Sequence, residues 1–314
     1  MLVLAPSRSF LANQQTIANP VSVSGVGLHT GVKVNLRLCP ARANTGVLFR
    51  RTDLEGFTIE AHSRNVARVS YATSLMKKGV LISTTEHLLS ALAGMEVDNV
   101  NVELDNLELP ILDGSARPFV ELINKAGIKR QRAKRKFVKI LRPVEVIDGI
   151  KRIAVYPADV FHVTYCISFP HPLIGTQTIE FASGTSSYAN EIAPARTFGF
   201  LEELEMLRKN GLIRGGSLEN AVVLDRAGVV NPEGLRFPDE FCRHKLLDLI
   251  GDFSLLGHSL LGHVVAERAG HAMHAQLVSR LLREKQSWKL VSVPEAAPDS
   301  ASEPAPVFAT TEAQ

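Results

Sequence analysis

Cysteine is scarce in this sequence of 314 residues, which holds Cys39, Cys166 and Cys242 and no CxxC spacing. Thiols so far apart exclude a disulfide framework and a thiolate zinc knuckle, and they are typical of a reducing cytoplasm. Long apolar runs are also missing, since none approaches the roughly 18 residues that a membrane helix needs. The first residues, MLVLAP, lack the basic region and apolar stretch of a secretory signal. We therefore expect a cytoplasmic protein.

The charge balance and several absent motifs narrow the function further. The 35 basic and 32 acidic residues leave a formal charge of +3, too small to indicate a nucleic-acid-binding protein. The sequence contains no GxxxxGK phosphate loop, no GxGxxG turn that opens a helix after a strand, and no GxSxG elbow. The HExxH and HxxEH patterns of zinc proteases are absent as well. These absences disfavour nucleoside-triphosphate chemistry, serine hydrolysis and the protease arrangements.

Length and composition divide the chain into parts. At roughly 150 residues per domain, the chain is long enough for two domains. The segment 129–136, KRQRAKRK, carries six positive charges in eight residues and predicts a solvated linker, because such charges repel one another. Binding to a phosphate-rich partner or an anionic membrane is the alternative for this segment. Residues 294–314, rich in Pro and Ala, predict a disordered tail, which leaves domains at 1–128 and 137–293.

Strand and helix patterns recur on both sides of the predicted linker. Strict alternation of apolar and polar residues, or runs of β-branched and aromatic residues, predict strands at 32–38, 99–105, 137–146, 152–156 and 161–169. Helical spacing with capping residues predicts helices at 85–93, 118–126, 239–256 and 271–286. Strands followed by two helices, twice over, indicate a duplicated α+β unit.

His244 and Asp248 form the sharpest local pattern for chemistry. They stand four residues apart on the helix predicted at 239–256, so both side chains project from one face, and Asp252 follows one turn later. An imidazole and a carboxylate at this spacing can bind one divalent ion. Polar pairs at this spacing are also common on solvated helix faces, so the pattern alone leaves both interpretations open.

Glu86 and His87 begin another predicted helix and offer the groups that are still missing. One of the two can bind a metal while its neighbour reaches the metal-bound water, where a carboxylate can act as general base. His271 follows Gly270 and begins the last predicted helix. A protonated histidine there would stabilise an oxyanion or protonate a leaving amine. For His274 an exposed polar position is the preferred interpretation. Structural or surface roles are expected for His62, His162, His171, His258 and His263.

The segment at about 199–232 has no counterpart in the first half and is predicted to be an insertion. Its leucines, Leu201, Leu204, Leu207 and Leu212, have helix-like spacing and precede a glycine pair. Apolar stripes of this kind are mostly core, whereas one that faced outward would hold a lipid chain.

Six blocks of the sequence together resemble the UDP-3-O-acyl-N-acetylglucosamine deacetylases, the zinc amidases of lipid A biosynthesis in Gram-negative bacteria. They follow the family's order from about residue 12 to 290: SGVGLHTG (24–31), STTEHLLSAL (83–92), PILDGS (110–115), ARTFGF (195–200), GLRF (234–237) and RHKLLDLIGD (243–252). The blocks are specific as a set, and the tail lies outside them.

The resemblance implies a fold, a reaction and a role for each site residue. The fold would be two similar α+β domains, each a sheet packed on two helices, with the active site between them. The reaction would be hydrolysis of the N-acetyl group of UDP-3-O-acyl-N-acetylglucosamine, the committed step of lipid A biosynthesis. The implied roles are zinc binding by His87, His244 and Asp248, general base catalysis by Glu86, oxyanion stabilisation and amine protonation by His271, orientation of that histidine by Asp252, oxyanion donation by Thr197, sugar contact by Phe198 and diphosphate contact by Lys245. The insertion would form the passage for the acyl chain.

The metal and the partners follow from the same residues. Zinc is expected, and Fe²⁺ also suits two histidines and an aspartate. The expected partner is the UDP-sugar substrate; we expect a monomer, no nucleic acid, and at most weak association with the inner membrane surface. The alternatives are a zinc hydrolase of a non-lipid amide or sugar, and a membrane- or nucleic-acid-binding module whose structural metal is closed by a fourth protein ligand.

Overall fold

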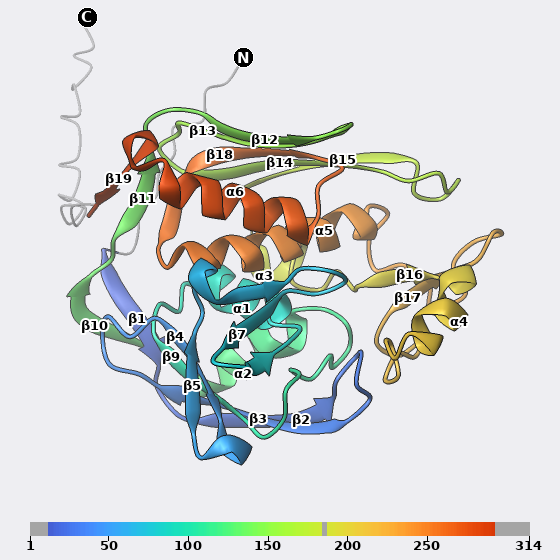
Figure 1. Cartoon of the computed structure of the whole chain (residues 1–314), viewed down its shortest axis with the longest axis horizontal. Coiled ribbons are helices and arrows are strands. Elements are labelled where there is room, and N and C mark those ends of the chain that lie inside the picture. The colour runs from blue at the N-terminus through green and yellow to red at the C-terminus, as the bar shows by residue number, and fades with distance from the viewer. Residues whose placement is uncertain (1–11, 184–186, 293–314) are drawn as a thin grey trace, which may run out of the picture.

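Two β-sheets form the outer layers of the molecule, and helices fill the space between them (Figure 1). The computed structural model describes residues 12–183 and 187–292. The lower sheet in Figure 1 belongs to the first half of the chain and the upper sheet to the second. Each sheet buries one face against helices, as the α+β class requires. The predicted fold class is confirmed.

The lower sheet has the strand order β2-β3-β9-β4-β5, with β4 and β9 parallel. Its strands alternate buried and exposed residues; in β3, for example, Val34, Leu36 and Leu38 are buried between exposed polar side chains. The strands of this half are β1 (Asn13–Ile17), β2 (Val21–Val26), β3 (Lys33–Pro40), β4 (Val47–Arg51), β5 (Phe57–Glu60), β6 (Val66–Arg68), β7 (Ser74–Lys77), β8 (Val80–Ile82) and β9 (Val100–Leu104). Strands β6, β7 and β8 form a small sheet of their own.

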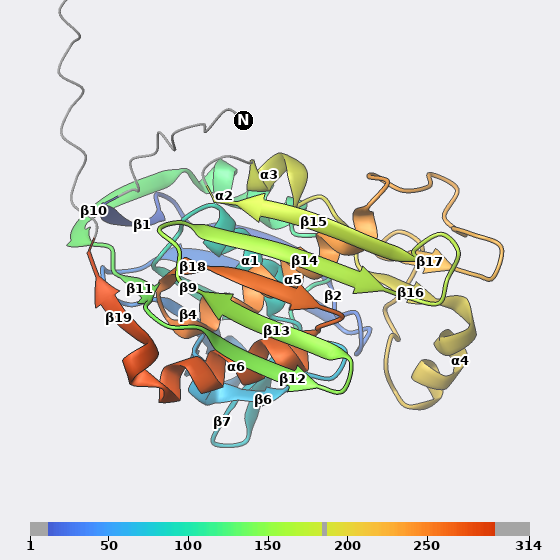
Figure 2. The ribbon, with the colours of Figure 1, turned by 90° about the horizontal axis from the view of Figure 1, so that it is seen from above.

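The upper sheet is organised around its longest strand, β18, which pairs with β13, β14 and β11 (Figure 2). The pairing with β14 and β11 is parallel and that with β13 is antiparallel. The strands of the second half are β10 (Ile128–Lys134), β11 (Phe137–Ile140), β12 (Val144–Asp148), β13 (Lys151–Tyr156), β14 (Phe161–Ser168), β15 (Thr176–Ala182), β16 (Phe198–Phe200), β17 (Val222–Leu224), β18 (Ser259–Glu267) and β19 (Trp288–Val291).

Helices α1 and α5 pack against each other at the centre of the molecule (Figure 1). The helices are α1 (Glu86–Gly94), α2 (Arg117–Ala126), α3 (Tyr188–Glu191), α4 (Leu201–Lys209), α5 (Glu240–Phe253) and α6 (His271–Arg283). A Cβ atom at Gly251 of α5 would lie 2.1 Å from the backbone oxygen of Glu86 in α1. Glycine is therefore what lets the two helices approach so closely.

The segment at about 199–232, predicted to be an insertion, contains most of β16 together with α4 and β17, and it lies at the right-hand end of the molecule (Figures 1 and 2). Strands β16 and β17 pair in parallel. On α4, Leu207 is buried, but Leu201 and Met206 are 46% and 52% exposed. The apolar stripe is thus only partly core, and much of its apolar surface faces outward.

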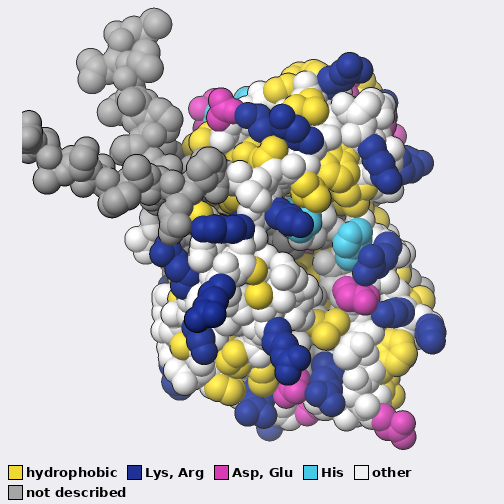
Figure 3. All heavy atoms as spheres, turned by 90° about the vertical axis from the view of Figure 1, so that its left-hand side faces the viewer, with side chains coloured by type: hydrophobic (Ala, Val, Ile, Leu, Met, Phe, Trp, Pro, Cys, Tyr) yellow, Lys and Arg dark blue, Asp and Glu magenta, His cyan; other side chains and the backbone are white. Residues whose placement is uncertain are grey.

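The basic segment at 129–136 is mostly a β-strand rather than a free linker. Strand β10 pairs antiparallel with β1, so its backbone is tied to the start of the described chain. Lysines and arginines of β10 point to solvent, where their charges remain hydrated, and Lys and Arg side chains are prominent on this side of the molecule (Figure 3). Arg135 is instead buried, because Asp98 and Glu96 neutralise it at 2.8 Å and 3.2 Å.

Two further predictions concern the strand at 137–146 and the tail at 294–314. The strand predicted at 137–146 is divided into β11 and β12, which the intervening Pro143 explains, since proline has no N–H to donate. The predicted tail, 294–314, lies outside the described residues. Among the described residues, every helix is too short or too polar to cross a bilayer.

Candidate active site

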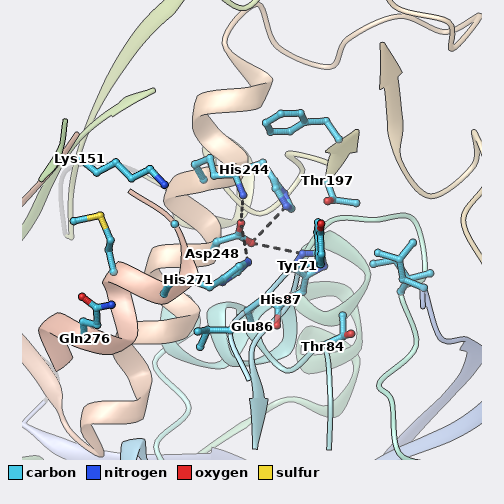
Figure 4. Close-up of a pocket in the computed structure, with 18 of the residues that line it drawn as sticks. Tyr71, Thr84, Glu86, His87, Lys151, Thr197, His244, Asp248, His271 and Gln276 are labelled. Carbon is cyan, nitrogen blue, oxygen red and sulfur yellow. Dashed lines mark hydrogen bonds and ion pairs between the residues drawn. The ribbon is translucent and has the colours of Figure 1, made fainter. Parts of the chain in front are cut away.

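A cavity of about 360 Å³ lies between the two halves of the chain, at the ends of the central helices (Figure 4). Helix α1 supplies Glu86 and His87 to its wall, and α5 supplies His244, Lys245 and Asp248. His271 enters from the first turn of α6, and Thr197 and Phe198 come from the entrance to the insertion. The structure therefore brings together residues that lie far apart in the sequence, such as Glu86 and His271, which are separated by 185 positions (Figure 4).

His87, His244 and Asp248 converge on one point of this cavity. The Nε2 atoms of His87 and His244 lie 3.7 Å and 3.4 Å from Oδ1 of Asp248, and the two imidazole rings meet edge to face. The possible ligand atoms all lie within 4.8 Å of one another, and all three side chains are buried. This spacing suits three ligands around one divalent cation.

Hydrogen bonding prepares these side chains to bind a cation. Nδ1 of His244 lies 3.0 Å from the backbone oxygen of Ala195, which accepts its proton and leaves Nε2 with a free lone pair. Asp248 Oδ1 is buried and has no hydrogen-bond partner among the described residues. Its other oxygen accepts a hydrogen bond from Nζ of Lys245 at 2.9 Å. A buried carboxylate oxygen without a donor, facing two imidazole lone pairs, fits a metal ligand set.

The protonation states agree with this ligand role. Burial and, to a lesser extent, the neighbouring His244 lower the pKa of His87 to about 3. Burial likewise lowers the pKa of His244. Burial alone would raise the pKa of Asp248, but His244 and Lys245 hold it well below its usual range. Neutral imidazoles and an ionised carboxylate are the forms that bind metals.

Glu86 lies at the first turn of α1, beside the ligand cluster. Burial, opposed by the His271 cation and assisted by the Asp248 and Asp252 carboxylates, raises the pKa of its carboxyl to about 7. The residue Thr84, just before the helix, has a φ of 57°, an uncommon value for a β-branched residue. Its hydroxyl donates to Oε1 of Glu108 at 3.0 Å, a bond that holds this strained entry to the helix. A carboxyl with a pKa near neutrality is suited to accept and return a proton.

Asp252 and His271 form an ion pair behind the ligand cluster. Nδ1 of His271 lies 2.8 Å from Oδ2 of Asp252, and Nε2 lies 3.7 Å from Oδ2 of Asp248. Burial alone would lower the pKa of His271, but Asp252 and Asp248 raise it to about 9. His271 is therefore a cation at neutral pH, and it faces the cavity.

The expectation for His274 is wrong, because this side chain is 0% exposed. Its Nδ1 lies 2.8 Å from Oδ2 of Asp252, and its Nε2 lies 3.0 Å from the hydroxyl of Tyr165. The spacing of three residues between His271 and His274 places both on one helix face, a signal that sequence could have used. No local pattern identified Tyr165 as the partner, since it comes from β14.

Other residues of the cavity wall have no signal in the sequence analysis. Tyr71, Lys151 and Gln276 line the cavity and are labelled in Figure 4. Tyr71 also has a φ of 64°, which turns the chain just before β7. Thr73, behind the wall, donates hydrogen bonds to both Glu86 and Asp252. Tyr71 and Thr73 lie in the loop before β7, Lys151 begins β13, and Gln276 lies within α6. Only the folded topology shows that these separate elements reach one site.

Comparison with known proteins places the chain in one family. The family model described as UDP-3-O-acyl N-acetylglycosamine deacetylase matches residues 14–283. A UDP-3-O-acyl-N-acetylglucosamine deacetylase of Solibacter usitatus is 55% identical over 90% of this chain and 96% of its own length. Proteins of the same name from Methylococcus capsulatus and Syntrophotalea carbinolica are 48% and 46% identical, each over 90% of this chain and over 94% and 92% of their own lengths. The chain belongs to the UDP-3-O-acyl N-acetylglycosamine deacetylase family.

Proposed function

We propose that this protein hydrolyses the N-acetyl group of UDP-3-O-acyl-N-acetylglucosamine, giving acetate and the free amine, the committed step of lipid A biosynthesis. The observation that carries the proposal is the combination around one cavity of a candidate metal ligand set, a carboxyl with a pKa of about 7 and a histidine with a pKa of about 9. Amide hydrolysis needs these three capacities: activation of water, proton transfer and stabilisation of an oxyanion.

His87, His244 and Asp248 would hold the metal, which we propose to be Zn²⁺, with Fe²⁺ as the alternative. The unpartnered Oδ1 of Asp248 and the two lone pairs directed toward it support this assignment. Bound there, such a cation would acidify a water molecule and polarise the amide carbonyl. Three protein ligands leave a position for substrate and water, which a structural site with four ligands would not.

Glu86 and His271 would move the protons of the reaction. The Glu86 carboxylate accepts a proton from the attacking water, and burial has already brought its pKa close to the working pH. The His271 cation, held by Asp252, stabilises the oxyanion and then protonates the departing amine. The hydroxyl of Thr197 lies in the cavity wall and would donate to the same oxyanion.

Lys245 and Phe198 would bind the polar part of the substrate. The Lys245 ammonium lies 5.7 Å from the centre of the Phe198 ring, so both line the same side of the cavity. We assign Phe198 to the sugar and Lys245 to the diphosphate. From Phe198, strand β16 leads to α4, whose exposed Leu201 and Met206 suit the acyl chain. The insertion at about 199–232 would thus form the acyl passage.

The proposal also covers the domain boundaries, the oligomeric state and the cellular location of the protein. We assign one domain to 1–128 and the other to 137–293, acting as a monomer in the cytoplasm. Weak association with the inner membrane surface would involve the exposed apolar residues of α4, where the acyl chain would emerge. The basic strand β10 lies at the opposite end of the molecule from α4 (Figure 1), so we assign no membrane contact to it in this proposal.

The test is a deacetylation assay of the purified full-length protein, with metal analysis of the same sample. Acetate release from UDP-3-O-acyl-N-acetylglucosamine, together with about one equivalent of zinc or iron, is expected. Equal activity on UDP-N-acetylglucosamine, which lacks the acyl chain, would show that the enzyme does not require a lipid substrate and would favour the non-lipid alternative. A metal-loaded protein that releases no acetate from either compound would overturn the proposal.

A further inference from the structure

Thr73 links two acidic side chains that come from different halves of the chain. The residue is 1% exposed and lies immediately before β7, in the first half. Its backbone N–H donates to Oε2 of Glu86 at 3.0 Å, and its hydroxyl donates to Oδ1 of Asp252 at 2.6 Å. One residue thus contacts both the candidate general base and the carboxylate that pairs with His271.

The backbone of Thr73 is itself fixed from the other side. Its carbonyl oxygen accepts two hydrogen bonds from Thr85, one from the N–H at 3.2 Å and one from the hydroxyl at 3.0 Å. Thr85 is fully buried and immediately precedes α1, the helix that begins with Glu86. Thr73 is therefore connected to the start of α1 through three hydrogen bonds, two with Thr85 and one with Glu86.

The Asp252 carboxylate has three donors, and Thr73 is the one that comes from the first half. Oδ2 accepts from Nδ1 of His271 and from Nδ1 of His274, each at 2.8 Å, and both histidines lie on α6. Among the described residues, Oδ1 accepts a side-chain hydrogen bond from the Thr73 hydroxyl alone. Without that hydroxyl, the carboxylate could rotate about its bond to Cβ, since its remaining donors both hold the other oxygen.

We propose that Thr73 is a positioning residue of the deacetylase site, whose hydroxyl fixes the Asp252–His271 pair relative to Glu86 across the boundary between the two halves of the chain. The inference rests on the proposed function, because it assigns Glu86 and His271 to one reaction. A base and an acid that act on the same amide must be held within fractions of an ångström of their working positions. Thr73 supplies that constraint as one residue, through its backbone N–H to Glu86 and its hydroxyl to Asp252.

The test compares Thr73→Val with Thr73→Ser. Valine has nearly the shape of threonine but no hydroxyl, whereas serine keeps the hydroxyl. For Thr73→Val we expect kcat to fall about 10- to 100-fold, as for other residues that orient catalytic groups, with KM changed less than about threefold. Thr73→Ser should keep kcat within about threefold of wild type. Metal content should be unchanged in both, because Thr73 contacts none of the three ligands.

Ser90→Ala is the matched control. Ser90 is also fully buried, and its hydroxyl accepts a hydrogen bond at 2.7 Å from Tyr188, which likewise comes from the second half. Its loss removes a buried bond between the halves without touching the site, so kcat should stay at the wild-type value while the melting temperature falls. If Thr73→Val lowers the melting temperature as Ser90→Ala does but leaves kcat unchanged, or if Thr73→Ser is as slow as Thr73→Val, Thr73 has only a structural role.

A second readout does not depend on turnover. The proton on Nδ1 of His271 should give a downfield NMR resonance in the zinc-loaded full chain, assigned by its loss in His271→Gln. We expect Thr73→Val, but neither Ser90→Ala nor Thr73→Ser, to shift this resonance. Absence of acetate release by the wild type would contradict the proposed function alone. An unshifted resonance in Thr73→Val would contradict the positioning role, whatever the wild type catalyses.

Discussion

Two buried clusters of one aspartate and two histidines lie one turn apart along α5, and they are prepared for different tasks. In the Asp248 cluster, with His87 and His244, the carboxylate oxygen Oδ1 faces two imidazole nitrogens at 3.4–3.7 Å and has no hydrogen donor among the described residues. In the Asp252 cluster, with His271 and His274, the distances are 2.8 Å and each contact is a hydrogen bond.

The difference comes from the surroundings of each aspartate rather than from the residue types. The Ala195 carbonyl takes the Nδ1 proton of His244, so a lone pair remains for a cation. The Asp252 carboxylate is instead saturated by protons from two imidazoles and the Thr73 hydroxyl. One aspartate and two histidines can thus be arranged either to bind a metal or to share protons in hydrogen bonds. The outcome depends on which nitrogen of each histidine already donates a hydrogen bond.

The largest effect should come from breaking the first cluster. Asp248→Ala removes the carboxylate that faces both imidazoles, and we expect loss of the metal with a fall in kcat of at least about a thousandfold. Asp252→Asn should keep the metal and lower kcat only about 10- to 100-fold, because it weakens the support of His271. Metal analysis after dialysis, with kcat on the same samples, measures the contrast. Equal metal loss in both variants would mean that the second cluster also binds the cation.

Glu86→Ala is expected to lower kcat by about 10² to 10⁴, the usual contribution of a general base, while the metal stays bound. The Glu86 side chain accepts a hydrogen bond from the backbone of Thr73, and it makes none with the three proposed ligands. Glutamine at the same position is the control for shape. Loss of metal from Glu86→Ala would mean that the roles of Glu86 and His87 are exchanged.

The pH profile of kcat/KM should be bell-shaped, with an acidic limb that reports Glu86 and a basic limb that reports His271. Glu86 acts as a base only when ionised, so activity should fall about tenfold per pH unit below its pKa of about 7. His271 acts only while protonated, so activity should fall in the same way above its pKa of about 9. In Asp252→Asn the basic limb should move to lower pH, because the carboxylate that stabilises the cation is gone. If the basic limb does not move in Asp252→Asn, His271 is not the group whose deprotonation causes it.

The smallest effect is expected for His274. Its replacement by leucine leaves the buried Asp252 carboxylate with one donor fewer, which should cost about 1–3 kcal/mol of unfolding free energy. The effect on kcat should be only a few-fold, because His271 and Thr73 still hold the carboxylate. Urea unfolding followed by circular dichroism measures the first quantity. His274→Gln, which retains an N–H donor, should lose less stability; an equal loss would show that packing matters more than the hydrogen bond.

Local patterns predicted most of the site but not its connections. The i, i+4 spacing of His244 and Asp248 and the position of Glu86 at a helix start are properties of single elements, so they are visible in the sequence. The burial of His274 and the bonds of Thr73 depend on how α6 and the segment before β7 meet α5. Those contacts arise from tertiary packing, which periodicity does not encode. The family resemblance supplied the assembly of the ligands; the local patterns alone left it open.

The fold was predictable to a similar extent. Alternating strands and amphipathic helices gave the α+β class, whereas the small sheet of β6, β7 and β8 had no clear periodic signal. The dense positive charge at 129–136 predicted a free linker, because neighbouring lysine and arginine side chains repel one another and favour solvent. Pairing with β1 overrides that preference, since the long side chains reach water from a strand as readily as from a loop.

Gly251 has a consequence for how this protein tolerates variation. The methyl carbon of an alanine would need the space that the carbonyl oxygen of Glu86 occupies, so α1 and α5 would have to separate. The two histidines proposed to grip one cation come from these two helices, and a displacement of about 1 Å is enough to impair a catalytic geometry. Any side chain at position 251 should therefore lower both the stability of the protein and its turnover, although this buried position does not line the cavity.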